Sequence, residues 1–389
     1  MLLSLKTLLF LVGFTATYLM PTACLWDTDT LAMERSKFPT LNELIVGHFP
    51  RHSQAYYEWR IKDRSITQAK RRHPEDFDDL AVAQDKLGRH AEAIETMREK
   101  LRQWPDTGLY KTHANLGTFL VHSGQYEEGL KHIQKAIEIN PDAHFGREIY
   151  QQRLVEYMME VTASDRQPFF KENDFRKFVL RRAKEVGQID DQSPNRTKQE
   201  REEIERAVKG VSGMIRFGNH DSPILLAALA QLLDDSYDQA SPKRLAARAY
   251  LRSAENGQVK GWRERMLRSA ANALKLQQDV PLQLVRKRLE DEVKLADKLQ
   301  QRIAADERRW IESGTNVDRK FAEKYYYGGA TKTPPMLPAT NTLKGFGKAS
   351  GKGNAISIAW FIAAAAAGLL LVVIGAGVVV LYRTMPAKE

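Results

Sequence analysis

The sequence predicts an all-α protein: a solenoid of helix–turn–helix repeats, followed by a long charged helix and one membrane-spanning helix. Three observations support this prediction. Residues 74–105 resemble residues 110–141, residues 281–313 carry apolar side chains three and four positions apart, and residues 356–382 contain no charge. The chain has 389 residues and one cysteine. One thiol cannot form an intramolecular disulfide, so packing must stabilise the fold.

The two similar segments align at an offset of 36 residues, measured from Gly88 to Gly124. A period of this length with two apolar-striped helices per unit is typical of a helical solenoid. A proline ends each unit, because proline has no N–H with which to continue the helix. The aligned positions are Leu80 and Leu116, Ala81 and Gly117, Gly88 and Gly124, Ala93 and Gly129, and Pro105 and Pro141.

These motifs resemble the tetratricopeptide repeat family. Its first helix carries Leu followed by a small residue, as in Leu116-Gly117, and its turn reads Gly-polar-Tyr followed by acidic and small residues. Residues 124–129 (GQYEEG) fit this pattern, whereas residues 88–93 (GRHAEA) lack the aromatic. Two extra residues near Asp106 and the polar Gln84 also depart from it. The resemblance implies a scaffold that binds a protein or peptide, with no catalytic residue and no cofactor.

We expect the repeats to extend over residues 74–161, with 143–161 as the first helix of a degenerate third unit or as a cap. At least three stacked units are needed to bury a continuous core, so flanking helices must supply the rest.

In this family the first helix of each repeat lines a concave groove, and a consensus asparagine there bonds the backbone of a bound peptide. By resemblance Asn115 holds that position. Lys111 and His122 share its helix face, and the matching face of the preceding repeat carries Asp78, Asp79 and Asp85. Such a groove would suit an extended peptide that carries both positive and negative charges. The alternative is that these six residues are simply solvated.

Residues 1–24 predict a secretory signal peptide, because one lysine precedes an apolar run that ends in small residues. Lipid attachment at Cys24 is the alternative, although the lipoprotein signal prefers Leu where this chain has Pro21.

Residues 26–30 (WDTDT) resemble the phosphate-transfer loop of the haloacid dehalogenase family, but no hydrophobic strand precedes them. We interpret them as a turn that caps the next helix. Residues 25–73 then form helices that cover the N-terminal end of the solenoid. Thr40 and Glu43 have the spacing of a capping box at the start of one of them.

Residues 162–280 predict further helices of similar type. Ser222-Pro223 and Ser241-Pro242 each combine an N-cap with a proline in the first turn. These helices diverge from the repeat pattern, so an envelope enzyme or cell-wall-binding protein that uses residues 169–276 is the alternative function.

Residues 281–313 predict one long helix whose apolar residues follow a heptad. Glu292 and Asp306 occupy heptad core positions, which weakens a coiled-coil interpretation. A stalk, a lid folded back on the repeats and a self-associating coil all remain open.

Residues 314–355 predict a flexible linker, since residues 328–354 are rich in Gly, Pro, Thr and Lys. The 27 uncharged residues 356–382 would form a helix of about 40 Å, enough to cross a bilayer core of about 30 Å. Residues 383–389 would form a short tail.

The signal peptide and the span together predict a single-pass protein of a cell membrane, with its bulk in a periplasm-like space. The net charge of +10 favours anionic partners. The sequence contains neither a groove-docking module nor an aromatic stacking platform, so we do not expect nucleic-acid binding. The nine histidines show no metal-ligand spacing. The predicted function is a non-enzymatic scaffold tethered to the membrane.

Overall fold

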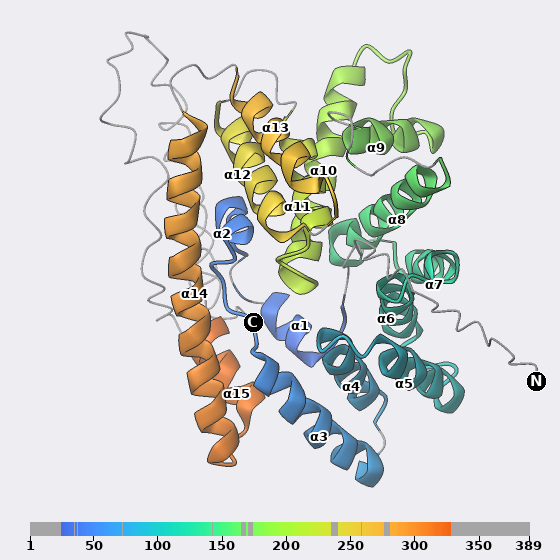
Figure 1. Cartoon of the computed structure of the whole chain (residues 1–389). Helices are drawn as coiled ribbons and strands as arrows, with labels where there is room; N and C mark the ends of the chain where they lie inside the picture. The colour runs from blue at the N-terminus through green and yellow to red at the C-terminus, as the bar shows by residue number, and fades with distance from the viewer. Residues whose placement is uncertain are drawn as a thin grey trace, which may run out of the picture. The chain divides into compact units, whose positions relative to one another are not determined.

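The computed structural model describes residues 25–34, 36, 38–71, 73–141, 143–164, 169, 174–234, 240–257, 259–275 and 281–327 (Figure 1). These residues form helices joined by short turns, and they contain no strand. The all-α prediction is confirmed for this part of the chain. The expected signal peptide at 1–24 and the tail at 383–389 lie outside it.

The prediction of one transmembrane helix, and with it the single-pass membrane localisation, is corrected by the structure. Within the described ranges, no helix is both long enough and apolar enough to cross a membrane. The most apolar helix, α11 (Pro223–Asp234), has 12 residues, and at 1.5 Å per residue it reaches only about 18 Å. The expected span at 356–382 lies outside the described residues.

Three helices precede the repeats: α1 (Thr28–Glu34), α2 (Leu41–Val46) and α3 (Gln54–Arg71). The capping box at α2 is confirmed, because the Thr40 side chain accepts from the Glu43 backbone and the Glu43 side chain accepts from the Thr40 backbone. Helix α3 packs against α4, and α1 contacts α4 as well.

The repeats form two helix pairs, and an additional helix follows them. The turns within the pairs contain Gly88 (φ 75°) and Gly124 (φ 82°), and glycine adopts such positive φ angles without the steric cost of a Cβ. Successive helices pack against one another from α4 through α8. Their bounds are α4 (Pro74–Lys86), α5 (His90–Gln103), α6 (Leu109–His122), α7 (Tyr126–Ile139) and α8 (Arg147–Ala163).

The largest apolar core joins α2 and α8 to the helices that follow the repeats. In α11, Leu225, Ala228 and Leu229 are fully buried. In α12, Ala246, Ala249 and Tyr250 are also fully buried. The helices of this layer are α9 (Asp174–Glu185), α10 (Arg196–Phe217), α11, α12 (Ala240–Asn256) and α13 (Trp262–Leu274).

Helix α14 (Leu282–Glu312) folds back on its own chain, with its main contacts on α2, α3, α12 and α13 (Figure 1). Its apolar stripe is buried there. The acidic heptad positions are buried and paired: Glu292 accepts from Arg248 at 2.6 Å, and Asp306 accepts from Tyr325 at 2.5 Å.

The linker expected from residue 314 begins with folded structure. Asn316 caps α15 (Val317–Phe321) by accepting from the Arg319 backbone at 2.8 Å. A π-helical turn, Ala322–Tyr326, follows α15. Phe321 and Tyr325 pack on the apolar stripe of α14, which is the physical reason why this part is ordered. Residues 328–355 lie outside the described part of the chain.

Candidate functional site

The first helices of the two repeats hold a short segment of the chain itself, residues 25–34, which we call the N-terminal strap. Asn115 in α6 is fully buried. Its Oδ1 accepts from the Trp26 backbone N–H at 2.7 Å, and its Nδ2 donates to the Trp26 carbonyl at 2.8 Å. This amide therefore pairs with both backbone groups of one residue, a contact that does not depend on the side chain of that residue.

Asp79 occupies the same repeat position one unit earlier, 36 residues before Asn115. Its carboxylate accepts from the Thr28 backbone N–H at 2.9 Å and from the Thr28 hydroxyl at 2.9 Å. Equivalent positions in α4 and α6 thus hold strap residues 28 and 26, respectively. The two first helices form the inner face of the repeats.

Two arginines of α3 neutralise the acids at this face. Arg60 is fully buried and donates to Asp27 at 2.8 Å, and its guanidinium lies 2.9 Å from Asp79. Arg64 donates to Asp79 at 2.8 Å. Burial raises the pKa of Asp79, but the charges of both arginines outweigh burial and lower it. The strap is therefore held by charge pairs inside the fold as well as by backbone contacts.

Asp27 also caps α1, because its carboxylate accepts from the Thr30 backbone N–H at 2.7 Å. The interpretation of residues 26–30 as a capping turn is confirmed by this bond.

Asp29 of the strap reaches the C-terminal helices through one histidine. His52 Nε2 lies 3.0 Å from Asp29, and His52 Nδ1 lies 2.5 Å from Glu307 of α14. The His52 ring stacks on Tyr56 at 3.6 Å between centroids. Burial lowers the pKa of His52, but Asp29 and Glu307 outweigh it and raise the pKa to about 9. His52 therefore joins strap and α14 as a cation at neutral pH.

Asp78 positions the amide of Asn115. Lys100 Nζ lies 2.7 Å from both Asp78 oxygens, and Asn115 Nδ2 lies 3.4 Å from Asp78 Oδ1. Burial raises the pKa of Asp78 to about 7, although the charges of Lys100 and the half-buried Lys111 oppose that shift. This acid faces the repeat interior and orients the amide that holds Trp26.

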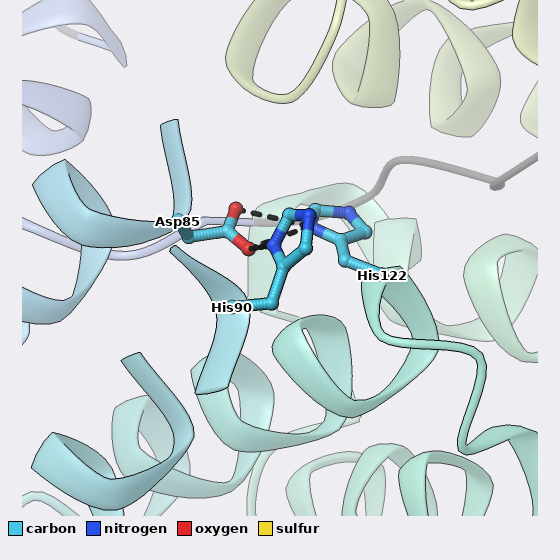
Figure 2. Close-up of side chains that lie close together, drawn as sticks. All are labelled: Asp85, His90 and His122. Atoms are coloured by element: carbon cyan, nitrogen blue, oxygen red, sulfur yellow. Dashed lines mark hydrogen bonds and ion pairs between the residues drawn. The ribbon is translucent and has the colours of Figure 1, made fainter. Parts of the chain in front are cut away.

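Asp85, His90 and His122 form a second polar cluster at the junction of the repeats (Figure 2). Asp85 Oδ1 lies 2.7 Å from His90 Nδ1 and 2.8 Å from His122 Nδ1. Burial raises the pKa of Asp85, but His122 and His90 outweigh it and lower the pKa. The hydrogen bond to Asp85 raises the pKa of His90.

This cluster forms part of the wall of a cavity of about 460 Å³ between the strap, the repeats and the end of α10. Cationic side chains also line it, among them Arg51, Lys86 and Arg216. Lys86 donates to the Phe217 carbonyl at 3.0 Å.

The structure places all six predicted groove residues on α4 and α6. Asp78, Asp79, Asp85, Asn115 and His122 are buried, so the alternative that they are solvated fails for these five. They contact other parts of the chain: Asp79 and Asn115 hold the strap, Asp78 supports Asn115, and Asp85 pairs with His122.

The sequence analysis did not predict four partners of the buried acids, namely Arg60, Arg64, Lys100 and His90. Arg60 and Arg64 lie four residues apart on one helix, a spacing that places them on one face. That signal was available, but it does not say which acids they meet. His90 occupies the position that Tyr126 has in the second repeat. This difference between the repeats indicated that His90 has a role other than that of the family's aromatic residue.

A family model described as tetratricopeptide repeat matches residues 110–143, which cover the second repeat. No curated protein matches the chain. A tetratricopeptide repeat indicates a protein–protein interaction module and is typically not catalytic.

Proposed function

We propose that the chain is a non-enzymatic interaction module whose repeats bind an extended stretch of polypeptide along the inner face of α4 and α6. The pairing of the Asn115 amide with both backbone groups of Trp26 is the observation that carries this proposal. The repeat-equivalent Asp79 supports it through Thr28. In the chain itself the strap fills this face, so a partner peptide must compete with the strap.

The contacts of the strap define the chemistry of a competing partner. The Trp26 ring lies edge-on to Tyr110 at 5.4 Å between centroids, Asp27 meets Arg60 at 2.8 Å, and the Thr28 hydroxyl meets Asp79 at 2.9 Å. A partner segment that reads aromatic, acidic, hydroxyl would satisfy the same groups. Its backbone would supply the N–H and carbonyl that Asn115 requires.

The divergent helices at 169–276 were the alternative location of a function. They bury the largest apolar core, and Trp262, Met266 and Ala270 of α13 are within it. Such packing fits a supporting layer for the repeats, which favours the interaction module over the enzyme or wall-binding alternative.

The test uses the full chain and a fluorescein-labelled peptide with the strap sequence LWDTDTLAME. Wild-type protein should bind this peptide weakly, because its own strap occupies the face. Trp26→Ala removes the indole that anchors the strap, so we expect at least tenfold tighter binding of the free peptide. Adding Asn115→Ala should weaken binding about tenfold, since losing such hydrogen bonds costs about 1–3 kcal/mol.

Gln103→Ala, at an exposed position on α5, added to Trp26→Ala is the matched control and should leave the affinity unchanged. A peptide of scrambled sequence controls for its charge. Equal affinity with and without Asn115→Ala would contradict the proposal.

A further inference from the structure

We propose that Asp85, His90 and His122 form a binding site for a divalent transition-metal ion of the zinc class, open to the cavity between strap and repeats. Its three ligands are distinct from Asn115 and Asp79, which hold the strap residues Trp26 and Thr28, so the two proposals are tested with different variants.

The three side chains come from separate elements that the repeat geometry brings together (Figure 2). Asp85 lies in the last turn of α4, His90 is the first residue of α5, and His122 is the last residue of α6. One ligand atom from each lies within 4.8 Å of the other two. The turn at Gly88, with φ 75°, reverses the chain so that His90 faces Asp85.

The donor set suits zinc. Two imidazole nitrogens and one carboxylate oxygen are a common three-ligand set for Zn²⁺, and the same set also binds Fe²⁺. Both rings direct Nδ1 at the same carboxylate oxygen, at 2.7 and 2.8 Å. Both histidine nitrogens thus approach the same carboxylate, and His122 Nδ1 also lies 2.9 Å from Asp85 Oδ2.

An ion requires a small outward movement of these atoms. Ligand atoms bound at about 2.0–2.1 Å around a tetrahedral zinc lie roughly 3.3 Å apart. The Asp85 oxygen must therefore separate by about 0.5 Å from each histidine nitrogen, and the ligand atoms of the two histidines lie within 4.8 Å of each other. His90 has a side chain 32% exposed at the start of its helix, so it can make this movement without disturbing the core.

The ion takes the place of protons. In the ion-free chain the Nδ1 atoms share protons with Asp85, and a metal binds only the deprotonated nitrogen. A metal bound at Nδ1 therefore takes the position of the proton that each ring directs at Asp85. A cluster held by hydrogen bonds alone would show no such exchange.

The cavity favours an anion at the fourth coordination position. Lys86 and Arg216 line it together with the three ligands. Arg216 is buried, and its Nε and Nη1 have no hydrogen-bond partner within the described chain. Arg216 Nη2 donates to the Met33 carbonyl, and Asp27 and Asp29 also line the cavity; an anion that enters it would pair with Arg216 Nε and Nη1.

The experiment titrates the full chain, first stripped of metal by a chelator, with ZnCl₂ in a calorimeter and with CoCl₂ by visible absorption. We expect one ion per chain and an absorption spectrum of tetrahedral cobalt. His90→Ala and Asp85→Asn should each lower the zinc affinity at least tenfold. His73→Ala changes an exposed histidine just before α4 and should leave the affinity as it is.

His90→Ala decides the outcome, because His90 is partly exposed and its loss should leave the fold intact by circular dichroism. Zinc should raise the melting temperature of the wild type and leave that of His90→Ala unchanged. No uptake of zinc by wild type at micromolar concentration, or equal affinity in His90→Ala, would overturn the proposal. Neither result bears on peptide binding, whose deciding residue is Asn115.

Discussion

The two repeats have the same helix–turn–helix backbone, but they bury different polar side chains. At equivalent positions the first repeat has Asp79 and Asp85, where the second has Asn115 and Val121. The second repeat is the one that the tetratricopeptide model matches. The first departs from the family pattern at the residues that bind α3, the strap and the two histidines. Asp79 and Asp85 thus attach α3, the strap and the histidines to the first repeat, and Asn115 attaches the strap to the second.

The two repeats also differ in how closely their two helices pack against each other. A Cβ added to Gly117 would lie 2.8 Å from Ile133 and 2.9 Å from the Gly129 carbonyl. The first pair has Ala81 and Ala93 at these positions, both fully buried. The second pair therefore relies on close backbone approach, and the first pair leaves room for a methyl group on each helix.

The largest effect should come from Asp79→Ala. It leaves the fully buried Arg60 with half of its charge compensation, and removing one partner of a buried ion pair costs about 3–5 kcal/mol. Urea denaturation measures the free energy of unfolding. Asp63→Ala, an exposed acid beside the same Arg64, is the control and should change it by less than about 1 kcal/mol. If Asp79→Ala and Asp63→Ala lowered the free energy of unfolding equally, the buried acid of the first repeat would not have the stabilising role assigned to it.

A second effect concerns pH and tests the link from strap to α14. The pKa of His52 is about 9 in the fold, against about 6.5 in the unfolded chain. The contribution of His52 is fully present below pH 6.5 and is lost as pH rises through 9, a change of about 3 kcal/mol. Urea midpoints at steps of pH should fall over that window in wild type and fall less in His52→Gln. Parallel curves would mean that His52 is not the titrating group.

Gly117→Ala should destabilise by about 1–3 kcal/mol, because overpacking forces the helices of the second repeat apart. The reciprocal change in the first repeat, Ala81→Gly, should lose only about 1 kcal/mol through helix propensity. Thermal denaturation of both variants checks the order. If Ala81→Gly lowered the melting temperature more than Gly117→Ala, the close approach of α6 and α7 would not be the contact that is most sensitive to an added methyl group.

The smallest effect should come from the exposed bridge between the repeats. Arg98 lies 3.0 Å from Glu128, and both side chains are more than 40% exposed. Solvent and salt screen such a pair, so Arg98→Ala should change stability by less than about 1 kcal/mol. Added salt should then affect wild type and variant alike. A larger loss would show that surface charge, and not the buried acids, joins the repeats.

Local features of the fold were predictable from the sequence. The 36-residue offset, the glycine turns and the capping box at Thr40 each depend on residues near in sequence, and α14 follows from its apolar stripe. The site was predictable only in part. Position in the repeat pointed to Asn115, but its partner Trp26 lies 89 residues away, and no periodicity encodes a contact between an irregular segment and a helix.

The histidine cluster escaped prediction for a related reason. Metal-ligand spacing within one helix or loop is visible in sequence, but His122 reaches Asp85 across 37 residues through the stacking of repeats. The membrane prediction depended on the length and the lack of charge of residues 356–382, which lie outside the described residues.

The bond between His52 and Glu307 spans 255 residues of sequence. During translation at about 5–20 residues per second, the strap and α3 wait roughly 10–50 s for α14 to be synthesised. Until then His52 lacks its Glu307 partner, whereas the strap can already meet Arg60, Asp79 and Asn115. The bond to Glu307 therefore forms after the strap and the repeats have been synthesised, and the arrival of α14 completes the packing around His52.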